Sequence, residues 1–388
     1  MHRIFIAFLS LVLGNVHAES QEYFQAGYAE CRQAFRWECA KAVAVTAVVG
    51  HPTPDANLTI DSCLLPPTDR KENLLVLVSG IHGAEGAVGS AVQSLFLRET
   101  LPQLDRSTTG VLLVHGVNPY GFANGRRVNA DNVDLNRAFT SDPALYRSSN
   151  PGYESLRGLL QPAGPAHAGG LSGLFFPVKA GWQILRHGMA SARQAAVGGQ
   201  YAYPKGLFYG GQAIPHEVAL TTQLLDRVTQ GYRRLYFVAL HTGYGERAKL
   251  HLFAPSVRHA VSDALTRTLF AGHAVEFPGS GIVYTNGGDF LDFIAQRYQP
   301  HKPTVAITFE FGTLDSQTTW GSIRSIQNMV LENQGHQHGY ASETDRQRIQ
   351  ERFREMFYPS EIAWREQVLA QSRSVLQDTA VRFSRTRD

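Results

Sequence analysis

The stretch Leu74-Leu-Val-Leu-Val-Ser-Gly-Ile-His82-Gly-Ala-Glu85-Gly86 carries the strongest local signal in this chain of 388 residues. Its apolar first half predicts a buried strand, and Gly80 predicts where that strand stops. The imidazole of His82 and the carboxylate of Glu85 then follow three residues apart, so one turn can aim both at the same metal ion. Catalytic zinc is held by three protein ligands of this kind and keeps a fourth position open. His241, which ends another apolar run, is the candidate for the third ligand.

Other short apolar runs alternate with longer amphipathic stretches along the chain. The predicted strands are 74–78, 111–114, 235–240, 250–253 and 305–311, and the predicted helices are 87–101, 216–230, 257–270 and 322–333. This alternation is typical of an α/β domain with a central mixed, mostly parallel sheet that is flanked by helices.

Four polar residues fall where predicted strands end. His82, Asn118 and His241 follow three of the strands, and Glu310 lies at the end of the last one. In open α/β sheets, the working residues sit at the carboxyl ends of the strands, where several loops meet. The sequence therefore predicts that these four groups share one edge of the sheet.

Composition limits the classes of function. The chain is 43% apolar and 18% charged, and its formal charge is +3. Removal of residues 1–18 would take away Arg3 and no acidic residue, which changes the charge from +3 to +2. This balance excludes a disordered chain and gives no electrostatic reason to expect a nucleic-acid partner.

The N-terminus has the pattern of a secretory signal. Basic His2 and Arg3 precede an apolar stretch at 4–13, and small residues lead to Ala18. We expect cleavage near Ala18 and a secreted or periplasmic protein. An uncleaved membrane anchor is the alternative, although the apolar stretch is shorter than the roughly 20 residues that span a bilayer as a helix.

Three cysteines occur, all near the predicted mature N-terminus. In an oxidising compartment Cys31 and Cys39 are the simplest pair for a disulfide, which would leave Cys63 free. Ordinary buried thiols are the alternative. The spacing is wrong for a zinc finger.

We expect residues 19–388 to form a single catalytic domain with two additions. Residues 140–211 are rich in Pro, Gly and Ala, with one predicted helix at 182–196, and they are typical of an insertion that borders the site. The insertion is either a cover over a substrate cleft or a plain surface excursion. Residues 343–388 predict a tail of helices packed on the outside of the domain.

Three further motifs give the first stretch a wider meaning. They are Asn118-Pro-Tyr-Gly121, Val133-Asp-Leu-Asn-Arg137 and Thr308-Phe-Glu-Phe-Gly312. Together with the His-x-x-Glu turn and the strand-ending His241, and in this order, they resemble the zinc carboxypeptidase superfamily over residues 74–312. The resemblance implies the α/β fold of that superfamily and a single zinc ion.

The resemblance also assigns roles to residues around the metal. It makes His82, Glu85 and His241 the zinc ligands, and it makes Asp134 the carboxylate that fixes the tautomer of the first histidine. Glu310 matches the general base that takes a proton from the attacking water and passes it to the leaving amine.

A second group of residues would bind the substrate. Arg127 matches an arginine that polarises the scissile carbonyl, and its neighbour Arg126 competes for that role. Asn136 and Arg137 match the pair that holds a terminal carboxylate, for which the planar guanidinium is suited.

The resemblance is less regular further along the chain. Tyr284 precedes a loop similar to the family loop whose tyrosine closes over the substrate, and Tyr244 competes with it. The glycine spacing places the residue that lines the specificity pocket near Phe290. The 156 residues between Glu85 and His241 are about twice the usual separation, because they include the insertion.

The leading hypothesis is an exported zinc-dependent hydrolase that cleaves an amide bond next to a free carboxylate, with a C-terminal peptide bond as its first candidate. Small N-acyl amino acids or cell-wall peptides are alternative substrates for the same site. A non-catalytic module that binds peptide ends is the alternative from another class, although a pure binder has no need of Glu310. The expected partners are therefore peptides or N-acyl amino acids, with no nucleic acid and no stable membrane insertion.

Overall fold

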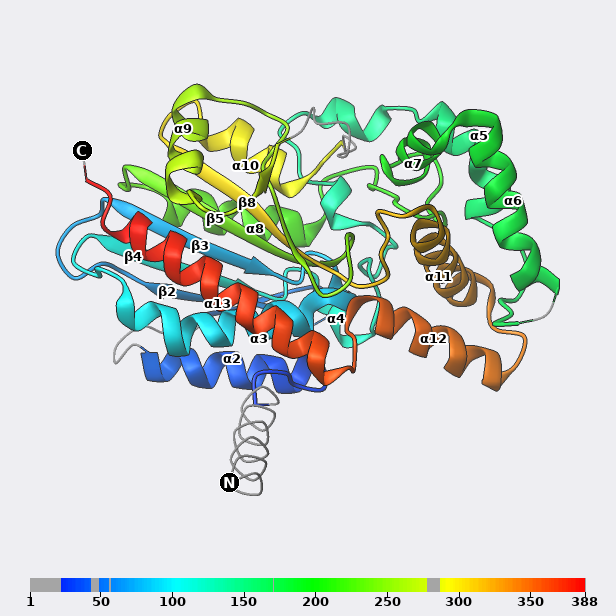
Figure 1. Ribbon diagram of the computed structural model, residues 1–388, viewed down its shortest axis with the longest axis horizontal. Coiled ribbons are helices and arrows are strands. Elements are labelled where there is room, and N and C mark those ends of the chain that lie inside the picture. Colours follow the sequence, from blue (N-terminus) through cyan, green and yellow to red (C-terminus); the bar gives the residue numbers. More distant parts are fainter. Residues whose placement is uncertain (1–21, 43–48, 56, 170, 278–286, 388) are drawn as a thin grey trace, which may run out of the picture.

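A computed structural model describes residues 22–42, 49–55, 57–169, 171–277 and 287–387 (Figure 1). The predicted signal segment at 1–18 and the candidate Tyr284 both lie outside the described residues. Among the helices within these ranges, none is long and apolar enough to cross a membrane.

Within the described ranges, a mixed sheet of eight strands has the order β1-β2-β4-β3-β5-β8-β6-β7 (Figure 1). The strands are β1 (Val49–Pro52), β2 (Thr59–Leu65), β3 (Asn73–Ser79), β4 (Thr109–His115), β5 (Arg234–Gly243), β6 (Leu250–Phe253), β7 (Val275–Glu276) and β8 (Thr304–Gly312). The pairs β3–β4, β3–β5, β5–β8 and β6–β7 are parallel, whereas β1–β2, β2–β4 and β6–β8 are antiparallel. The predicted mixed, mostly parallel α/β sheet is confirmed.

Helices pack on both faces of the sheet and at one end of the molecule (Figure 1). They are α2 (Tyr28–Ala42), α3 (Gly86–Leu95), α4 (Pro119–Ala123), α5 (Pro151–Leu160), α6 (Leu171–His187), α7 (Met189–Val197), α8 (His216–Val228), α9 (Ala260–Leu269), α10 (Phe290–Tyr298), α11 (Thr319–His338), α12 (Glu343–Phe357) and α13 (Ile362–Ser384). Because side chains alternate along a strand, Leu75 and Leu77 of β3 pack in the cluster that holds α2, α3 and α13, whereas Leu74 and Val76 pack in the cluster that holds α8 and α10.

The insertion at 140–211 forms helices of its own. The single helix predicted at 182–196 is wrong, because α6 and α7 are separated at Gly188, whose φ of +78° takes the backbone out of the helical region. Helices α5 to α7 lie at the end of the molecule that also holds α11 and α12 (Figure 1). Side chains from all of these helices share a third hydrophobic cluster, so the insertion is not a loose surface excursion.

The C-terminal helical segment makes hydrogen bonds to the carboxyl ends of β5 and β8. The Thr242 hydroxyl, at the end of β5, donates to the Phe357 carbonyl at 2.7 Å, and the Trp364 indole donates to the carbonyl of Gly312, the last residue of β8, at 2.9 Å. Trp364 is fully buried. The tail therefore supports the strand ends on which the predicted site residues lie.

The predicted Cys31–Cys39 bridge is wrong. Both residues lie in α2, and eight residues of helix separate their Cα atoms by about 12 Å, well beyond the reach of a disulfide. Cys31, Cys39 and Cys63 are all free and buried. The thiol of Cys39 contacts that of Cys63 in β2, and burial raises the pKa of Cys39.

Candidate metal centre

The turn after β3 is shaped by glycines. Gly80 has a φ of +70°, and a Cβ there would lie 2.9 Å from the Cα of Gly116. A Cβ on Gly83 would lie 2.1 Å from the backbone of Gly121, in the motif that begins at Asn118. Only residues without side chains allow these two turns to approach so closely, and the approach fixes the backbone on both sides of His82.

Three predicted ligands converge in this structure. His82 Nδ1 lies 2.8 Å from Glu85 Oε1, His241 Nδ1 lies 2.9 Å from Glu85 Oε2, and the two Nδ1 atoms are 3.2 Å apart. All three side chains are buried, and their ligand atoms lie within 4.8 Å of one another. The Thr242 amide donates to Glu85 Oε2 at 3.1 Å and so holds the carboxylate in this orientation.

The geometry of the three residues fits zinc. Tetrahedral N and O ligands at about 2.0 to 2.1 Å from zinc are about 3.4 Å apart. The separations of 2.8, 2.9 and 3.2 Å are close to that spacing, and the rings need only small shifts to match it. His82, Glu85 and His241 also line one cavity, which leaves a side open for water or substrate.

In this structure, Glu85 and His241 each favour the charged form of the other. Burial alone would raise the pKa of Glu85, but His82 and His241 outweigh this effect and hold that pKa below its usual range. Burial would likewise lower the pKa of His241, but the Glu85 carboxylate raises it. The site is thus built around an ionised carboxylate, as a metal ligand requires.

Asp134 and Arg127 form the next layer around His82. Asp134 Oδ1 lies 3.1 Å from His82 Nε2, the ring nitrogen opposite the one that faces Glu85. Arg127 donates from Nε to Asp134 Oδ2 at 3.0 Å and from Nη1 to Glu85 Oε1 at 3.4 Å. Burial would raise the pKa of Asp134, but Arg127, His82 and Arg137 hold it well below its usual value.

The segment that carries Arg127 is fixed by the Asn118 motif. The Arg127 carbonyl accepts from the Asn118 side chain at 3.1 Å and from the Gly83 amide at 3.2 Å. The competing Arg126 points elsewhere, since its Nε donates to Glu332 of α11 at 2.8 Å. The structure therefore places Arg127, and not Arg126, beside the ligands.

Glu310 lies one strand away from the third ligand. It pairs with His241 in the parallel register of β5 and β8, and its Oε1 accepts from the Tyr244 amide at 2.8 Å. Burial and the nearby Glu85 carboxylate raise the pKa of Glu310 to about 8. A bound cation would lower it again, into the range where a carboxylate accepts protons at neutral pH.

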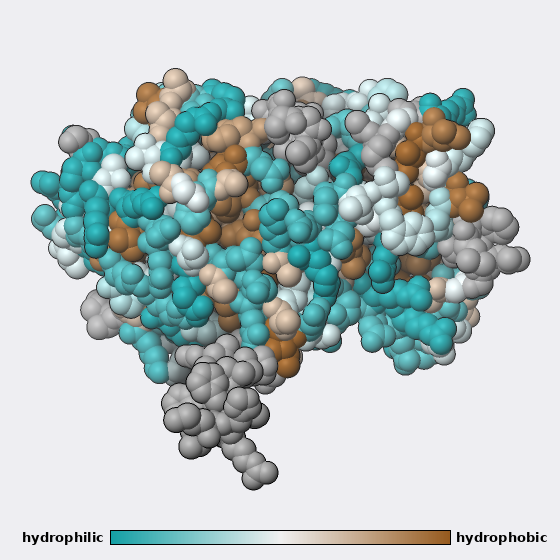
Figure 2. Space-filling model, in the orientation of Figure 1, coloured by the Kyte–Doolittle hydropathy of each residue, from teal (hydrophilic) through white to brown (hydrophobic). Residues whose placement is uncertain are grey.

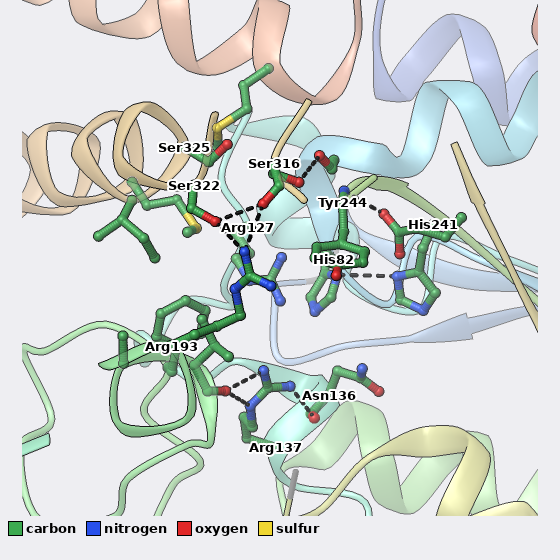
Figure 3. Close-up of a pocket in the computed structure, with 18 of the residues that line it drawn as sticks. His82, Arg127, Asn136, Arg137, Arg193, His241, Tyr244, Ser316, Ser322 and Ser325 are labelled. Atoms are coloured by element: carbon green, nitrogen blue, oxygen red, sulfur yellow. Dashed lines mark hydrogen bonds between the residues drawn. The ribbon is translucent and has the colours of Figure 1, made fainter. Parts of the chain in front are cut away.

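Asn136 and Arg137, the pair predicted to hold a substrate carboxylate, already bind other groups of the chain. Arg137 donates from Nε and Nη2 to the Val197 carbonyl at 3.1 and 2.7 Å, and from Nη1 to the Asn136 carbonyl at 2.8 Å (Figure 3). The side-chain amide of Asn136 donates to Asp289 Oδ2 at 2.9 Å. Both residues line the cavity, but the insertion, through Val197 at the end of α7, already fills the Arg137 fork.

A second arginine at the cavity comes from the insertion. Arg193 of α7 donates to the Ser316 carbonyl at 3.1 Å and to the Ser322 hydroxyl at 2.7 Å, and it reaches into the cavity opposite His82 (Figure 3). Its guanidinium lies 5.9 Å from the centre of the Tyr244 ring. Arg193 is not among the residues predicted for the site, because no motif marks it within a stretch rich in Pro, Gly and Ala.

The other aromatic candidates divide between the cavity and the core. Tyr244, the competitor of Tyr284, lines the cavity. Phe290 does not serve as a pocket wall, because it is fully buried against Phe139, while its neighbour Leu291 lines the cavity. His115 is a buried core residue that stacks on Phe35.

The chain is similar in arrangement to several solved structures. They include thrombin activatable fibrinolysis inhibitor (TAFI), at 15% identity over 82% of this chain and 74% of that chain, with a TM-score of 0.49. They also include murein-tripeptide amidase MpaA from Escherichia coli O157, at 16% identity over 76% and 95% and a TM-score of 0.38. Succinylglutamate desuccinylase from Chromobacterium violaceum shares 13% identity over 78% and 72%, with a TM-score of 0.37.

Comparison with curated proteins returns no match. A family model does match, and it spans residues 24–371, which include the sheet, the turn with His82 and Glu85, the insertion and the first part of α13. That family is described as "Protein of unknown function (DUF2817)". The chain belongs to the DUF2817 family.

Proposed function

We propose that this protein is an exported zinc-dependent hydrolase that cleaves an amide bond next to a free carboxylate, with the C-terminal bond of a peptide as the leading substrate. The observation that carries the proposal is the convergence of His82, Glu85 and His241, with Glu310 one strand away. A metal centre without a nearby base would suit a purely structural role. The Glu310 carboxylate beside the proposed metal centre is the feature that favours a catalytic role.

Each residue has a task in this scheme. Zinc, when bound, would supply Lewis acidity and make water a better nucleophile near neutral pH. Asp134 holds the His82 ring so that Nδ1 faces the metal site. Glu310 takes the proton of the attacking water and delivers it to the amine that leaves. Arg127, beside Glu85, is placed to polarise the scissile carbonyl.

The insertion affects how a substrate carboxylate would bind, because Val197 of the insertion contacts Arg137. A carboxylate that binds Arg137 has to displace the Val197 carbonyl from Nε and Nη2. Binding of a carboxylate at Arg137 therefore competes with the contact to Val197, the last residue of α7. Arg193, on the same helix, offers a second cation at the cavity.

A second candidate is deacylation of N-acyl amino acids on the same site, and the apolar side chains that line much of the cavity favour it. A panel of blocked dipeptides, N-acyl amino acids and cell-wall peptides, scored for released amine, separates the two. We expect zinc-dependent release from at least one class. Tight peptide binding without zinc, and no release from any class, would favour a binding module.

Export has its own test. The mature protein, purified from its native cells, should begin just after Ala18 when its N-terminus is read by mass spectrometry. An N-terminus at Met1 together with a membrane-associated protein would support an uncleaved anchor.

A further inference from the structure

The cavity at the metal centre extends between the insertion and the C-terminal helices. It has a volume of about 270 Å³ and is lined both by the three ligands and by side chains of α5, α6, α7, α11 and α12. Apolar groups dominate this extension, among them Leu160 of α5, Ala180 of α6, Ala196 of α7 and Met329 of α11. We call this part of the cavity the apolar chamber.

The side chains that form the walls of the chamber pack against one another. Leu160, Ala180, Ala196 and Met329 belong to one hydrophobic cluster, which also includes Phe357 of α12, and each of them is at least nine-tenths buried. Helices from two segments far apart in sequence thus build a common enclosure next to the metal site. Because these walls are already formed, a ligand that enters the chamber orders few protein side chains, and the entropic cost of binding is small.

The polar groups of the extension are few and partly engaged with one another. Arg193 donates to the Ser322 hydroxyl and to the Ser316 carbonyl, and both serines line the cavity. An apolar pocket with a few convergent polar groups is the usual form of a small-molecule site. In this cavity His82, Glu85 and His241 are the convergent polar groups, and the apolar surface extends away from them.

We infer that the apolar chamber binds a long, flexible apolar chain of the substrate while the scissile amide lies at the metal centre. The inference rests on the proposed function, because it assigns the chemical class of the substrate for the same site. Two parts of an amide substrate could supply such a chain, the acyl group or the amino-acid side chain. Both offer the same chemistry to the walls.

Binding of straight-chain carboxylates, from acetate to dodecanoate, tests the chamber without any turnover. Calorimetry on the wild-type protein should show an affinity that rises about fourfold for each added methylene until the chamber is full. The heat capacity change of binding should become more negative along the series. An affinity that does not depend on chain length would overturn the inference.

Two substitutions narrow the chamber from different helices. Ala180→Phe and Ala196→Leu should each abolish the gain in affinity that longer chains bring. Val178→Phe is the matched control on α6, because Val178 is 66% exposed on the outward side of that helix. Figure 2 shows hydrophobic residues on the surface of this part of the molecule. Folding of each variant is checked by thermal unfolding, and a folded Ala196→Leu protein that keeps the wild-type dependence on chain length would contradict the inference.

Kinetics then identify which part of the substrate enters. One series lengthens the acyl group of N-acyl glycine, and the other lengthens the straight side chain of N-acetyl amino acids. We expect kcat/KM to rise about fourfold per methylene in one of the two series. If neither series responds although the carboxylates bind by length, the chamber does not serve the substrate. If no amide is cleaved at all while that binding persists, the proposed function fails and the chamber stands.

Discussion

His82 Nε2 lies 3.1 Å from Asp134 Oδ1, on the opposite side of the ring from the nitrogen that faces Glu85. A carboxylate at one ring nitrogen fixes the tautomer and leaves the lone pair of the other nitrogen for a metal. Asp134 is itself fully buried and held by Arg127. This chain of contacts holds the His82 ring in one orientation, as a metal ligand would require.

Removal of the Asp134 charge should weaken metal binding. Asp134→Asn keeps the shape of the side chain but loses the carboxylate, so we expect the affinity for zinc to fall by about 10- to 100-fold. Competition with a chelator measures this. Asp131→Asn is the matched control, because Asp131 is exposed three residues away. Equal zinc affinity in Asp134→Asn and the wild type would show that the contact is not used.

Removal of the Glu310 carboxylate should abolish turnover and spare the metal. Glu310→Gln cannot accept a proton, and loss of a general base lowers kcat by roughly 100- to 10,000-fold. Zinc content should remain that of the wild type, because Glu310 is not one of the three converging ligands. Glu351→Gln, on the exposed side of α12, serves as the control. Full zinc-dependent turnover by Glu310→Gln would rule out the proposed mechanism.

The Arg137 fork should hold the insertion in place. Arg137→Lys cannot make the paired contact with the Val197 carbonyl, and we expect the free energy of unfolding to fall by about 1 to 3 kcal/mol. Limited proteolysis within 140–211 should become faster. Arg157→Lys is the control, since its side chain is 52% exposed on α5. A raised KM with unchanged stability and proteolysis would instead assign Arg137 to substrate binding alone.

Acid should destabilise the fold through His115. Burial lowers the pKa of His115 to about 4; Asp61 partly opposes this effect, and Arg32 and Arg36 add to it. The unfolded chain, with a histidine pKa of about 6.5, therefore takes up the proton first as the pH falls. Stability is fully present above that pH and is lost towards pH 4, by about 2 kcal/mol between pH 7 and pH 5.

Urea unfolding at pH 7, 6 and 5 measures this loss. His115→Gln should flatten the dependence of unfolding free energy on pH by about one proton, whereas His301→Gln, which changes an exposed residue, should not. Identical pH dependence in the wild type and His115→Gln would show that another group carries the effect.

The sheet and the ligand set could be predicted because each has a local signature. The five predicted strands all lie within observed strands. The central strands β3, β4, β5 and β8 could be predicted because buried strands are continuous apolar runs. Strand β2 was missed, because Asp61 interrupts its apolar pattern. The buried carboxylate is paired with α2, because Arg36 donates to it at 2.6 and 2.9 Å and Arg32 donates to it at 3.2 Å. Such compensation by a distant helix leaves no trace in the strand itself.

The role of the insertion could not be predicted from local pattern. The contacts between Arg137 and the Val197 carbonyl join residues 60 positions apart, and one partner is a backbone atom that any residue offers. Arg193 is in the same position, because its partners Ser316 and Ser322 lie more than 120 positions away. The apolar chamber likewise exists only where α5 to α7 meet α11 and α12.

Metal binding by the wild-type protein and three single variants tests the central claim most directly. Metal-free protein would be titrated with zinc, and bound metal would be quantified by mass spectrometry. We predict one zinc ion per wild-type chain and a loss of stoichiometric binding in His82→Ala, Glu85→Ala and His241→Ala, with all four proteins folded. A folded wild-type protein that binds no zinc, or that binds it equally well without these side chains, would contradict the account.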